Sequence, residues 1–294
     1  MINAKEFDKK YDFFITGATY VESPKPNSVL FIAKKLEALI KNLEQAYHCL
    51  VFIDNDMAVP EIFKEHNCIV TSDNPPKDYA LVANRIWQER QLKNQVREYS
   101  FTSQGYWIGD NVILGSGVTI QPGCFIDHDV ELGPDTIVLS GARISNAKIG
   151  QDCIIKQNAV IGGMGFIMAK DENNHISRIP SLGRVILGNQ VEIGSFTTVC
   201  CGTGNDTMLF NRVKLDDHVH IGHDVIVNND TEITAGVIVG GYCKIGSSSF
   251  IGINAALRNR VSLGKNITVG MGAVVTKSFG DGVTIMGNPA KLRG

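Results

Sequence analysis

Aliphatic residues recur at every sixth position through much of the chain, with polar residues or glycine at most positions between them. A six-residue period matches neither the 3.6-residue period of an amphipathic helix nor the simple alternation of one long strand. It is typical of a short strand followed by a turn, repeated many times. The longest unbroken run contains twelve aliphatic residues, at Leu209, Leu215, Ile221, Val227, Ile233, Val239, Ile245, Ile251, Leu257, Leu263, Val269 and Val275.

Shorter runs with the same spacing lie upstream and bring the total to 25 six-residue units. Three units would close a triangular coil of about 18 residues, with aliphatic side chains inside and neighbouring coils about 4.8 Å apart. Small or β-branched residues two places before many aliphatic positions fit tight corners, and frequent glycines fit turns. The sequence therefore predicts about eight stacked coils. The upstream runs are Ile108, Leu114, Ile120, Ile126, Leu132, Val138 and Ile144, then Ile149, Ile155 and Ile161, and then Leu187, Ile193 and Val199.

The repeat is absent from residues 1–100, which instead predict a small α/β domain. Short apolar runs bounded by turn residues favour strands, and longer amphipathic stretches favour helices. The expected strands are 11–18, 28–33, 48–54 and 67–73, and the expected helices are roughly 34–47, 60–66 and 78–95.

The repeat domain is expected over residues 101–276, with interruptions at 162–184 and 201–208. We call these the first and the second excursion. Long loops inside a regular array are often binding elements, although simple tolerance of insertions is the alternative. Residues 277–294 leave the six-residue spacing after Val275 and are expected to form a C-terminal tail.

Charge and composition narrow the class of partner. The 294-residue chain has 28 basic and 30 acidic residues, so it lacks the basic excess that nucleic acid or an anionic membrane would favour. No apolar run approaches the roughly 20 residues that cross a bilayer, and the N-terminal sequence lacks the apolar stretch of a signal peptide. The seven cysteines contain no CxxC pair. Reduced thiols in a cytoplasmic protein are the expectation.

Three histidines lie close together in the segment LDDHVHIGHD. Ile221 points inward by its register, so His220 and His223 on either side of it should project outward. An outward histidine in a cleft between subunits would accept a proton at neutral pH. Either Asp216 or Asp224 would orient the ring. The alternative is that these are ordinary solvated histidines.

Other chemistries have weaker support. His218 and His223 resemble the zinc-ligand pair of hexapeptide-repeat carbonic anhydrases, but no third histidine lies about two coils earlier. We therefore expect no metal. The cysteines at corner positions are best explained as small core residues. Cys200 and Cys201, beside the second excursion, are the remaining nucleophile candidates.

Two stretches, 160–199 and 216–227, resemble the UDP-3-O-acylglucosamine N-acyltransferases of lipid A synthesis, and 15–32 and 72–86 are similar to the nucleotide-binding domain of that family. The resemblance implies a left-handed parallel β-helix that assembles as a homotrimer. It implies that His223 is the catalytic histidine and that Asp216 supports it. Arg260 stands where the family has a second histidine that assists the oxyanion.

The chain also departs from that family. Lys34 and Glu37 follow Phe31 where the family has asparagine and tyrosine, and the helical extension that receives acyl carrier protein is missing. The end of the chain, 270–291, instead resembles CoA-dependent sugar N-acyltransferases. The resemblances together imply an N-acyltransferase that uses acyl-CoA as co-substrate, has no tightly bound cofactor, and acylates the amine of a nucleotide-linked amino sugar.

Three alternatives remain open. In the first, the chain would be a lipid A enzyme that uses acyl carrier protein. In the second it would be an O-acyltransferase, and in the third a non-catalytic nucleotide-binding assembly protein. Backbone N–H groups in the glycine-rich stretch 236–241 are candidate oxyanion donors. The expected substrate-binding residues are Gly165, Phe166, His220 and Arg260, and the expected residues for the acyl donor are Gly240, Gly241, Ala273, Lys277 and Lys291.

Overall fold

The computed structural model describes residues 1–293 and divides into two compact units. The N-terminal unit comprises Met1–Val96, Phe166–Leu182 and Thr203–Asn205. The second unit, called the prism below, comprises Arg97–Gly165, Gly183–Gly202 and Asp206–Gly294. Most of the first excursion and the centre of the second therefore belong to the N-terminal unit, although both leave from coils of the prism.

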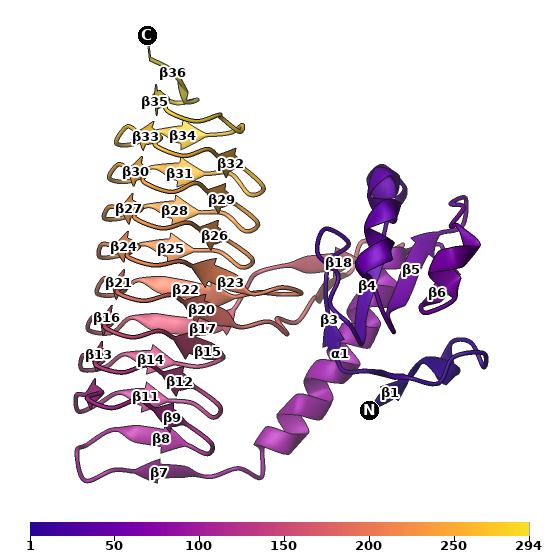
Figure 1. Ribbon diagram of the computed structural model, residues 1–294, viewed down its shortest axis with the longest axis horizontal. Coiled ribbons are helices and arrows are strands. Elements are labelled where there is room, and N and C mark those ends of the chain that lie inside the picture. The colour runs from indigo at the N-terminus through magenta and orange to yellow at the C-terminus, as the bar shows by residue number, and fades with distance from the viewer. Residues whose placement is uncertain (294) are drawn as a thin grey trace. The chain divides into compact units, whose positions relative to one another are not determined.

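The prism is a column of short strands that stack into three parallel sheets, one for each face (Figure 1). Face 1 contains β8 (Trp107–Gly109), β11 (Phe125–Ile126), β14 (Arg143–Ile144), β17 (Val160–Met164), β22 (Thr198–Cys201), β25 (His220–Ile221), β28 (Ile238–Val239), β31 (Ala256–Leu257) and β34 (Val274–Val275), with β7 (Tyr99–Phe101) antiparallel at its edge. Face 2 contains β9 (Ile113–Leu114), β12 (Glu131–Leu132), β15 (Ala147–Ile149), β20 (Val185–Leu187), β23 (Thr207–Leu209), β26 (Ile226–Val227), β29 (Lys244–Ile245) and β32 (Ser262–Leu263). Face 3 contains β10 (Thr119–Ile120), β13 (Ile137–Val138), β16 (Ile154–Ile155), β21 (Glu192–Ile193), β24 (Lys214–Leu215), β27 (Glu232–Ile233), β30 (Phe250–Ile251), β33 (Thr268–Val269), β35 (Thr284–Met286) and the antiparallel β36 (Lys291–Leu292).

The chain passes from face 1 to face 2 to face 3 and back, so each coil has three corners, called corner 1–2, corner 2–3 and corner 3–1. Successive coils pair in register where no excursion intervenes, as Ile221 does with Val239. Nine parallel strands on face 1 and eight on face 2 agree, within residues 1–293, with the expected number of coils.

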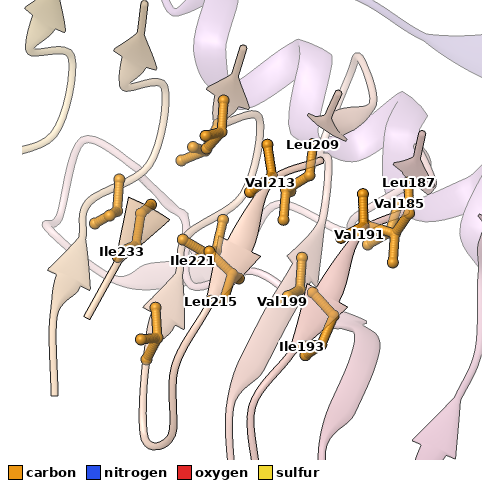
Figure 2. Packing of buried hydrophobic residues seen from close by; sticks show 14 of the residues in the cluster. Val185, Leu187, Val191, Ile193, Val199, Leu209, Val213, Leu215, Ile221 and Ile233 are labelled. Carbon is orange, nitrogen blue, oxygen red and sulfur yellow. The ribbon is translucent and has the colours of Figure 1, made fainter. Parts of the chain in front are cut away.

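The six-residue aliphatic positions form the core of the prism, as the repeat predicts. All twelve members of the longest run are at most 4% exposed. Figure 2 shows Leu215, Ile221 and Ile233 among the side chains that pack inside the column. Small side chains at the corners, such as Cys243 and Ala255, are fully buried. Each buried aliphatic side chain contributes roughly 1.5–3 kcal/mol, so the column is held together by burial along its whole length.

The C-terminal tail differs from the expectation that it leaves the repeat. Strand β35 pairs in parallel with β33, with Ile285 beside Val269, and Ile285 is fully buried. Phe279 likewise bridges to Leu263. Both pairings span a shorter stretch of chain than a regular coil does, so the last turn of the column continues the fold but escapes a six-residue count.

The N-terminal unit contains a four-stranded parallel sheet in the order β3 (Gly17–Ala18), β4 (Ser28–Ile32), β5 (Leu50–Asp54), β6 (Cys68–Ser72). Strands β1 (Ile2–Asn3) and β2 (Phe14–Ile15) form a separate antiparallel pair. The sheet agrees with the strands expected from sequence, except that the first expected strand is split between β2 and β3. The 3₁₀ segments are η1 (Ala4–Glu6), η2 (Lys34–Gln45) and η3 (Glu61–Lys64), and the α-helix is α1 (Pro75–Asn94).

Two of the three expected helices are thus 3₁₀ segments, and the third is α1. Asn74 caps α1 by accepting a hydrogen bond from the Lys77 backbone N–H, and Pro75 occupies the first turn. Tyr79, Ala83 and Ile86 are buried on one side of this helix. No helix among the described residues is both long enough and apolar enough to cross a membrane.

The excursions are tied to the N-terminal unit by backbone acceptors and a side-chain contact. The first forms the hairpin β18 (Met168–Lys170) and β19 (Ile176–Arg178). Asn84 donates to the Arg178 carbonyl at 2.9 Å, and Arg90 donates to the Leu182 carbonyl at 2.9 Å. In the second excursion the Thr19 hydroxyl contacts Asn205 Oδ1 at 3.2 Å. The excursions are therefore ordered parts of a packed unit.

Candidate functional site

His223 and Asp224 form a buried pair at corner 1–2, in the turn that follows β25. His223 Nδ1 lies 2.8 Å from Asp224 Oδ2, and each residue is 8% exposed. A carboxylate can only accept, so the proton belongs on Nδ1 and the Nε2 lone pair is left available as an acceptor. Within residues 1–293 the hydrogen bond of the His223 ring is the one that Nδ1 makes to Asp224. With its proton on Nδ1 and its lone pair on Nε2, the histidine is arranged to act as a general base.

The local backbone explains why the carboxylate reaches the ring. Asp224 has a left-handed φ of 58°, a conformation that aspartate tolerates better than most residues, and it bends the chain sharply at the corner. Its backbone N–H donates to the Thr207 hydroxyl at 2.8 Å. Thr207, at the start of β23, is fully buried and so fixes the turn from the coil below.

Two glycines leave the room that the His223 ring occupies. A Cβ on Gly165 would lie 2.6 Å from His223 Cβ, and a Cβ on Gly241 would lie 2.7 Å from His223 Nε2. Both separations are shorter than real side chains show. Gly165 thus allows the ring to pack, and Gly241 leaves open the space directly beside the basic nitrogen.

The Gly241 backbone N–H is a candidate donor for that space. Among residues 1–293 it donates to no other group, whereas the neighbouring Gly240 N–H is used by the Leu257 carbonyl at 3.0 Å. An N–H group without an acceptor, next to the base, suits a developing negative charge on a carbonyl oxygen. Of these two neighbouring N–H groups in the predicted stretch 236–241, Gly241 therefore remains a candidate oxyanion donor, whereas the Gly240 N–H is already used.

Tyr242 and Arg260 stand above the pair on the next two coils of corner 1–2. The Tyr242 ring meets the His223 ring edge-on, with centroids 4.8 Å apart at 88°. The Arg260 guanidinium carbon lies 4.1 Å from the centroid of Tyr242. Arg260, which the sequence analysis expects to bind substrate, thus lies at the same corner and is linked to His223 through the Tyr242 ring.

His220 projects outward from face 1 beside the pair. Its Nδ1 lies 2.7 Å from the Thr198 hydroxyl on the neighbouring strand. Burial, and then the charge of His223, lowers the pKa of His220 from the ordinary value of 6.5. A neutral His220 can donate or accept one hydrogen bond to a substrate without competing with His223 for the role of base.

Asp216 does not support His223, contrary to the resemblance. It is exposed at corner 3–1, where its side chain accepts from the Asp217 N–H at 2.8 Å and lines a shallow hollow with Lys156, Glu192 and Lys214. His223 lies at corner 1–2, one face further along the same coil. The acid adjacent in sequence, Asp224, takes the role because it shares the turn with the ring.

The remaining predicted residues are placed as follows. Phe166 is 80% exposed and belongs to the N-terminal unit, where Arg178 lies 5.5 Å from its ring centroid. Ala273 is fully buried, so its side chain belongs to the core of the prism. Lys277 and Lys291 are exposed, and Lys277 lies 5.5 Å from the centroid of Phe279. Phe166 directly follows Gly165, whose backbone packs against His223. Within residues 1–293 no contact joins Ala273, Lys277 or Lys291 to the His223 pair.

The histidine pair of the zinc alternative is separated. His218 is exposed at corner 3–1, stacked on Phe196 with centroids 5.3 Å apart at 5°, while His223 is buried at corner 1–2. Within residues 1–293 no three His, Cys, Asp or Glu side chains are grouped so as to hold a metal ion.

Sequence reasoning missed Thr207 and Tyr242. Tyr242 follows Asp224 by one full coil of the prism, so counting one coil forward from the histidine cluster would have found it. Thr207 lies on the coil before Asp224 and near the end of the second excursion, which interrupts the repeat there.

The chain has sequence relatives among N-acyltransferases. It is 34% identical over 210 residues to the UDP-3-O-acylglucosamine N-acyltransferase of Coxiella burnetii, and the match spans 63% of this chain and 61% of the relative. It is 32% identical over 147 residues to a probable UDP-3-O-acylglucosamine N-acyltransferase 2, mitochondrial, of Arabidopsis thaliana, and that match spans 50% of this chain and 48% of the relative. The chain therefore spans about half to three fifths of the length of these curated relatives. No family model matches it.

Solved structures share the fold of the prism. LpxA from Acinetobacter baumannii superposes with a TM-score of 0.59 at 24% identity, and the superposition covers 66% of this chain and 73% of the LpxA chain. A UDP-N-acetylglucosamine acyltransferase from Campylobacter jejuni gives a TM-score of 0.59 at 20% identity and covers 66% and 74%. The expected architecture, a left-handed parallel β-helix with a small N-terminal α/β part, is confirmed. So is the resemblance to hexapeptide-repeat acyltransferases.

Proposed function

We propose that this protein is an N-acyltransferase that moves an acyl group from a thioester to the amine of a nucleotide-linked amino sugar. The observation that carries the proposal is the arrangement of His223, whose Nδ1 is held by Asp224 at 2.8 Å, next to a Gly241 N–H that donates to no group within residues 1–293. A base and an oxyanion donor side by side are what acyl transfer to an amine requires.

The reaction follows from these two groups. The amine attacks the thioester carbonyl carbon while His223 Nε2 takes one proton from the nitrogen, and the carbonyl oxygen becomes an oxyanion facing the Gly241 N–H. The tetrahedral intermediate then collapses, the carbon–sulfur bond breaks, and the thiolate leaves and takes the proton from His223. A positioned base contributes about 10²–10⁴-fold, and one oxyanion donor about 10²–10³-fold.

The named relatives bear on the acceptor. The sequence alone favours a generic nucleotide amino sugar over the lipid A substrate, whereas both curated relatives carry the name UDP-3-O-acylglucosamine N-acyltransferase. We therefore favour a UDP-linked glucosamine with an acyl group on its 3-oxygen as the acceptor. The relatives support this choice through about half to three fifths of their length.

The donor is proposed as an acyl thioester on a phosphopantetheine arm, the chemistry that acyl-CoA and acyl carrier protein share. The pairing of β35 with the column and the exposure of Lys277 and Lys291 are compatible with either carrier. A homotrimer in the cytoplasm remains the proposed assembly, and a solution mass three times 32.0 kDa would support it.

The test is acyl transfer with purified protein. Acyl-CoA and acyl carrier protein esters of matched chain length are each offered with UDP-3-O-acylglucosamine and with the analogue that has a hydroxyl in place of the amine. We expect an amide product, identified by mass, with the amine acceptor only. Ester formation with the hydroxyl analogue would establish an O-acyltransferase instead, and no product with any pair would overturn the proposal. The faster donor identifies the carrier.

A further inference from the structure

We propose that Arg260 binds the diphosphate of the nucleotide sugar and thereby holds the amine against His223. This inference rests on the proposed function, and it names the part of the substrate that one residue recognises. Arg260, Tyr242 and His223 belong to one unit of the structure and to one corner of the prism. The geometry and the charge balance at this corner both support it.

The guanidinium lies at a suitable distance from the base. Its carbon is 4.1 Å from the Tyr242 centroid, and that ring is 4.8 Å from the His223 ring, so the guanidinium is within about 9 Å of the imidazole centre. In a UDP-linked glucosamine the amine is on C2, next to the C1 carbon whose oxygen carries the diphosphate, so the amine and the diphosphate lie within a few ångströms of each other. The phosphate of the acyl donor is much farther from the reacting carbon, because the whole pantetheine arm lies between them.

The charge of Arg260 is not neutralised by the protein. Within residues 1–293 its side chain forms no ion pair and donates no hydrogen bond, and its side-chain partner is the Tyr242 ring. Arg212, at the equivalent position of corner 2–3, instead donates to Asp230 at 2.8 Å. Arginine has a planar fork of donors that suits phosphate oxygens, and stacking on an aromatic ring orients that fork without consuming it.

The experiment measures binding separately from catalysis. The full chain is titrated with UDP and with uridine by calorimetry, for the wild type, Arg260→Gln and Arg260→Lys. Arg143→Gln is the matched control, because Arg143 is an exposed arginine stacked at 4.6 Å on the ring of Phe125, farther along the prism. Steady-state KM values for the acceptor and for the donor are measured on the same proteins.

We expect Arg260→Gln to weaken UDP binding by about 10- to 100-fold, the contribution of hydrogen bonds between charged groups, without changing uridine binding. Arg260→Lys should recover part of the loss, and Arg143→Gln should match the wild type. The acceptor KM should rise with the UDP dissociation constant while the donor KM stays constant. Unchanged UDP affinity in Arg260→Gln would overturn the inference, and so would a rise confined to the donor KM.

The two proposals fail in different ways. If the wild type acylates no amino sugar but UDP binding depends on Arg260, the proposed reaction is wrong and the diphosphate site stands. If the wild type is active and Arg260→Gln binds UDP normally, the reaction stands and the diphosphate site is wrong.

Discussion

Corners 1–2 and 2–3 of the prism have the same backbone conformation but different side chains. At corner 2–3, Arg212 and Asp230 have left-handed φ values of 60° and 59° on neighbouring coils and pair with each other. At corner 1–2, Asp224, Tyr242 and Arg260 have φ values of 58°, 64° and 66° on three successive coils. At corner 2–3 the two charged side chains neutralise each other. At corner 1–2 a carboxylate is directed onto a histidine, and the Arg260 guanidinium stacks on Tyr242.

The comparison separates what folds the column from what acts on substrate. Both corners place one left-handed residue per coil because the strand-and-turn unit requires a sharp bend, and that requirement is independent of side-chain chemistry. The chemistry depends on which side chains project outward. A substitution at corner 1–2 should therefore affect catalysis more than stability, and an equivalent substitution elsewhere should affect neither strongly.

The largest effect is expected from His223→Ala. Removing the base should lower kcat by about 10²–10⁴-fold, because proton removal from the amine then depends on water. His218→Ala is the matched control, since His218 is an exposed histidine on the same coil at corner 3–1. Initial rates at saturating substrates measure the effect, and a His223→Ala turnover within twofold of wild type would show that this histidine is not the base.

Asp224→Asn and Asp216→Asn decide between the acid adjacent to the ring and the acid that the resemblance favours. An asparagine amide at 224 can donate to Nδ1, which moves the ring proton to Nε2 and removes the acceptor. We expect Asp224→Asn to lower kcat by about 10- to 10³-fold by this change of tautomer. Asp216→Asn should leave kcat nearly unchanged, because Asp216 is exposed and accepts from the Asp217 N–H.

The reverse pattern would contradict the geometry. Full activity of Asp224→Asn combined with a strong loss in Asp216→Asn would mean that His223 is oriented from corner 3–1. Thermal unfolding of both variants distinguishes a changed tautomer from a changed fold, since Asp224 is buried and Asp216 is not.

Gly165→Ala should disturb the same ring sterically. The new Cβ would lie 2.6 Å from His223 Cβ, so the imidazole must shift, and we expect a loss of about 10-fold or more in kcat with about 1–3 kcal/mol of destabilisation. Gly163→Ala is a close control, because a Cβ at that position meets nothing within 4 Å. Equal activity of the two variants would show that the ring tolerates displacement.

The sequence predicts the column well because its rule is local and repeated. Each coil must bury an aliphatic side chain such as Ile221 or Val239 at a fixed spacing, so one rule applies many times. The tail escapes the rule because its pairings, such as that of Val269 with Ile285, close a shortened coil. A count of six cannot detect a shortened coil, although burial still demands an apolar residue there.

The site is harder to predict because it depends on which corner a side chain occupies. Asp216 and Asp224 are equally plausible partners for His223 in the sequence, and only the direction of the turn after β25 selects Asp224. Gly165 and Thr207 lie within the excursions, near their ends, where the spacing that relates one coil to the next is lost. Stacking contacts such as that of Arg260 on Tyr242 join side chains on neighbouring coils. The six-residue pattern indicates that coils stack, but it does not show which outward side chains then touch.

The smallest expected effect is the pH dependence that His220 gives to the stability of the folded protein. Burial and the charge of His223 lower the pKa of His220 in the folded protein from 6.5, so below that pH the unfolded chain binds a proton that the folded chain resists. Stability should therefore fall as the pH drops from 6.5 toward the folded pKa, and it should be unaffected by this group above 6.5.

His220→Gln removes the titration, so its unfolding temperature should decline less than that of the wild type between about pH 7.5 and 5.5. His175→Gln, at an exposed position in the first excursion, controls for the loss of a histidine. Parallel declines in the wild type and His220→Gln would mean that His220 is solvated like an ordinary surface histidine. Water would then reach face 1 beside His223 more freely than the contact between His220 and Thr198 indicates.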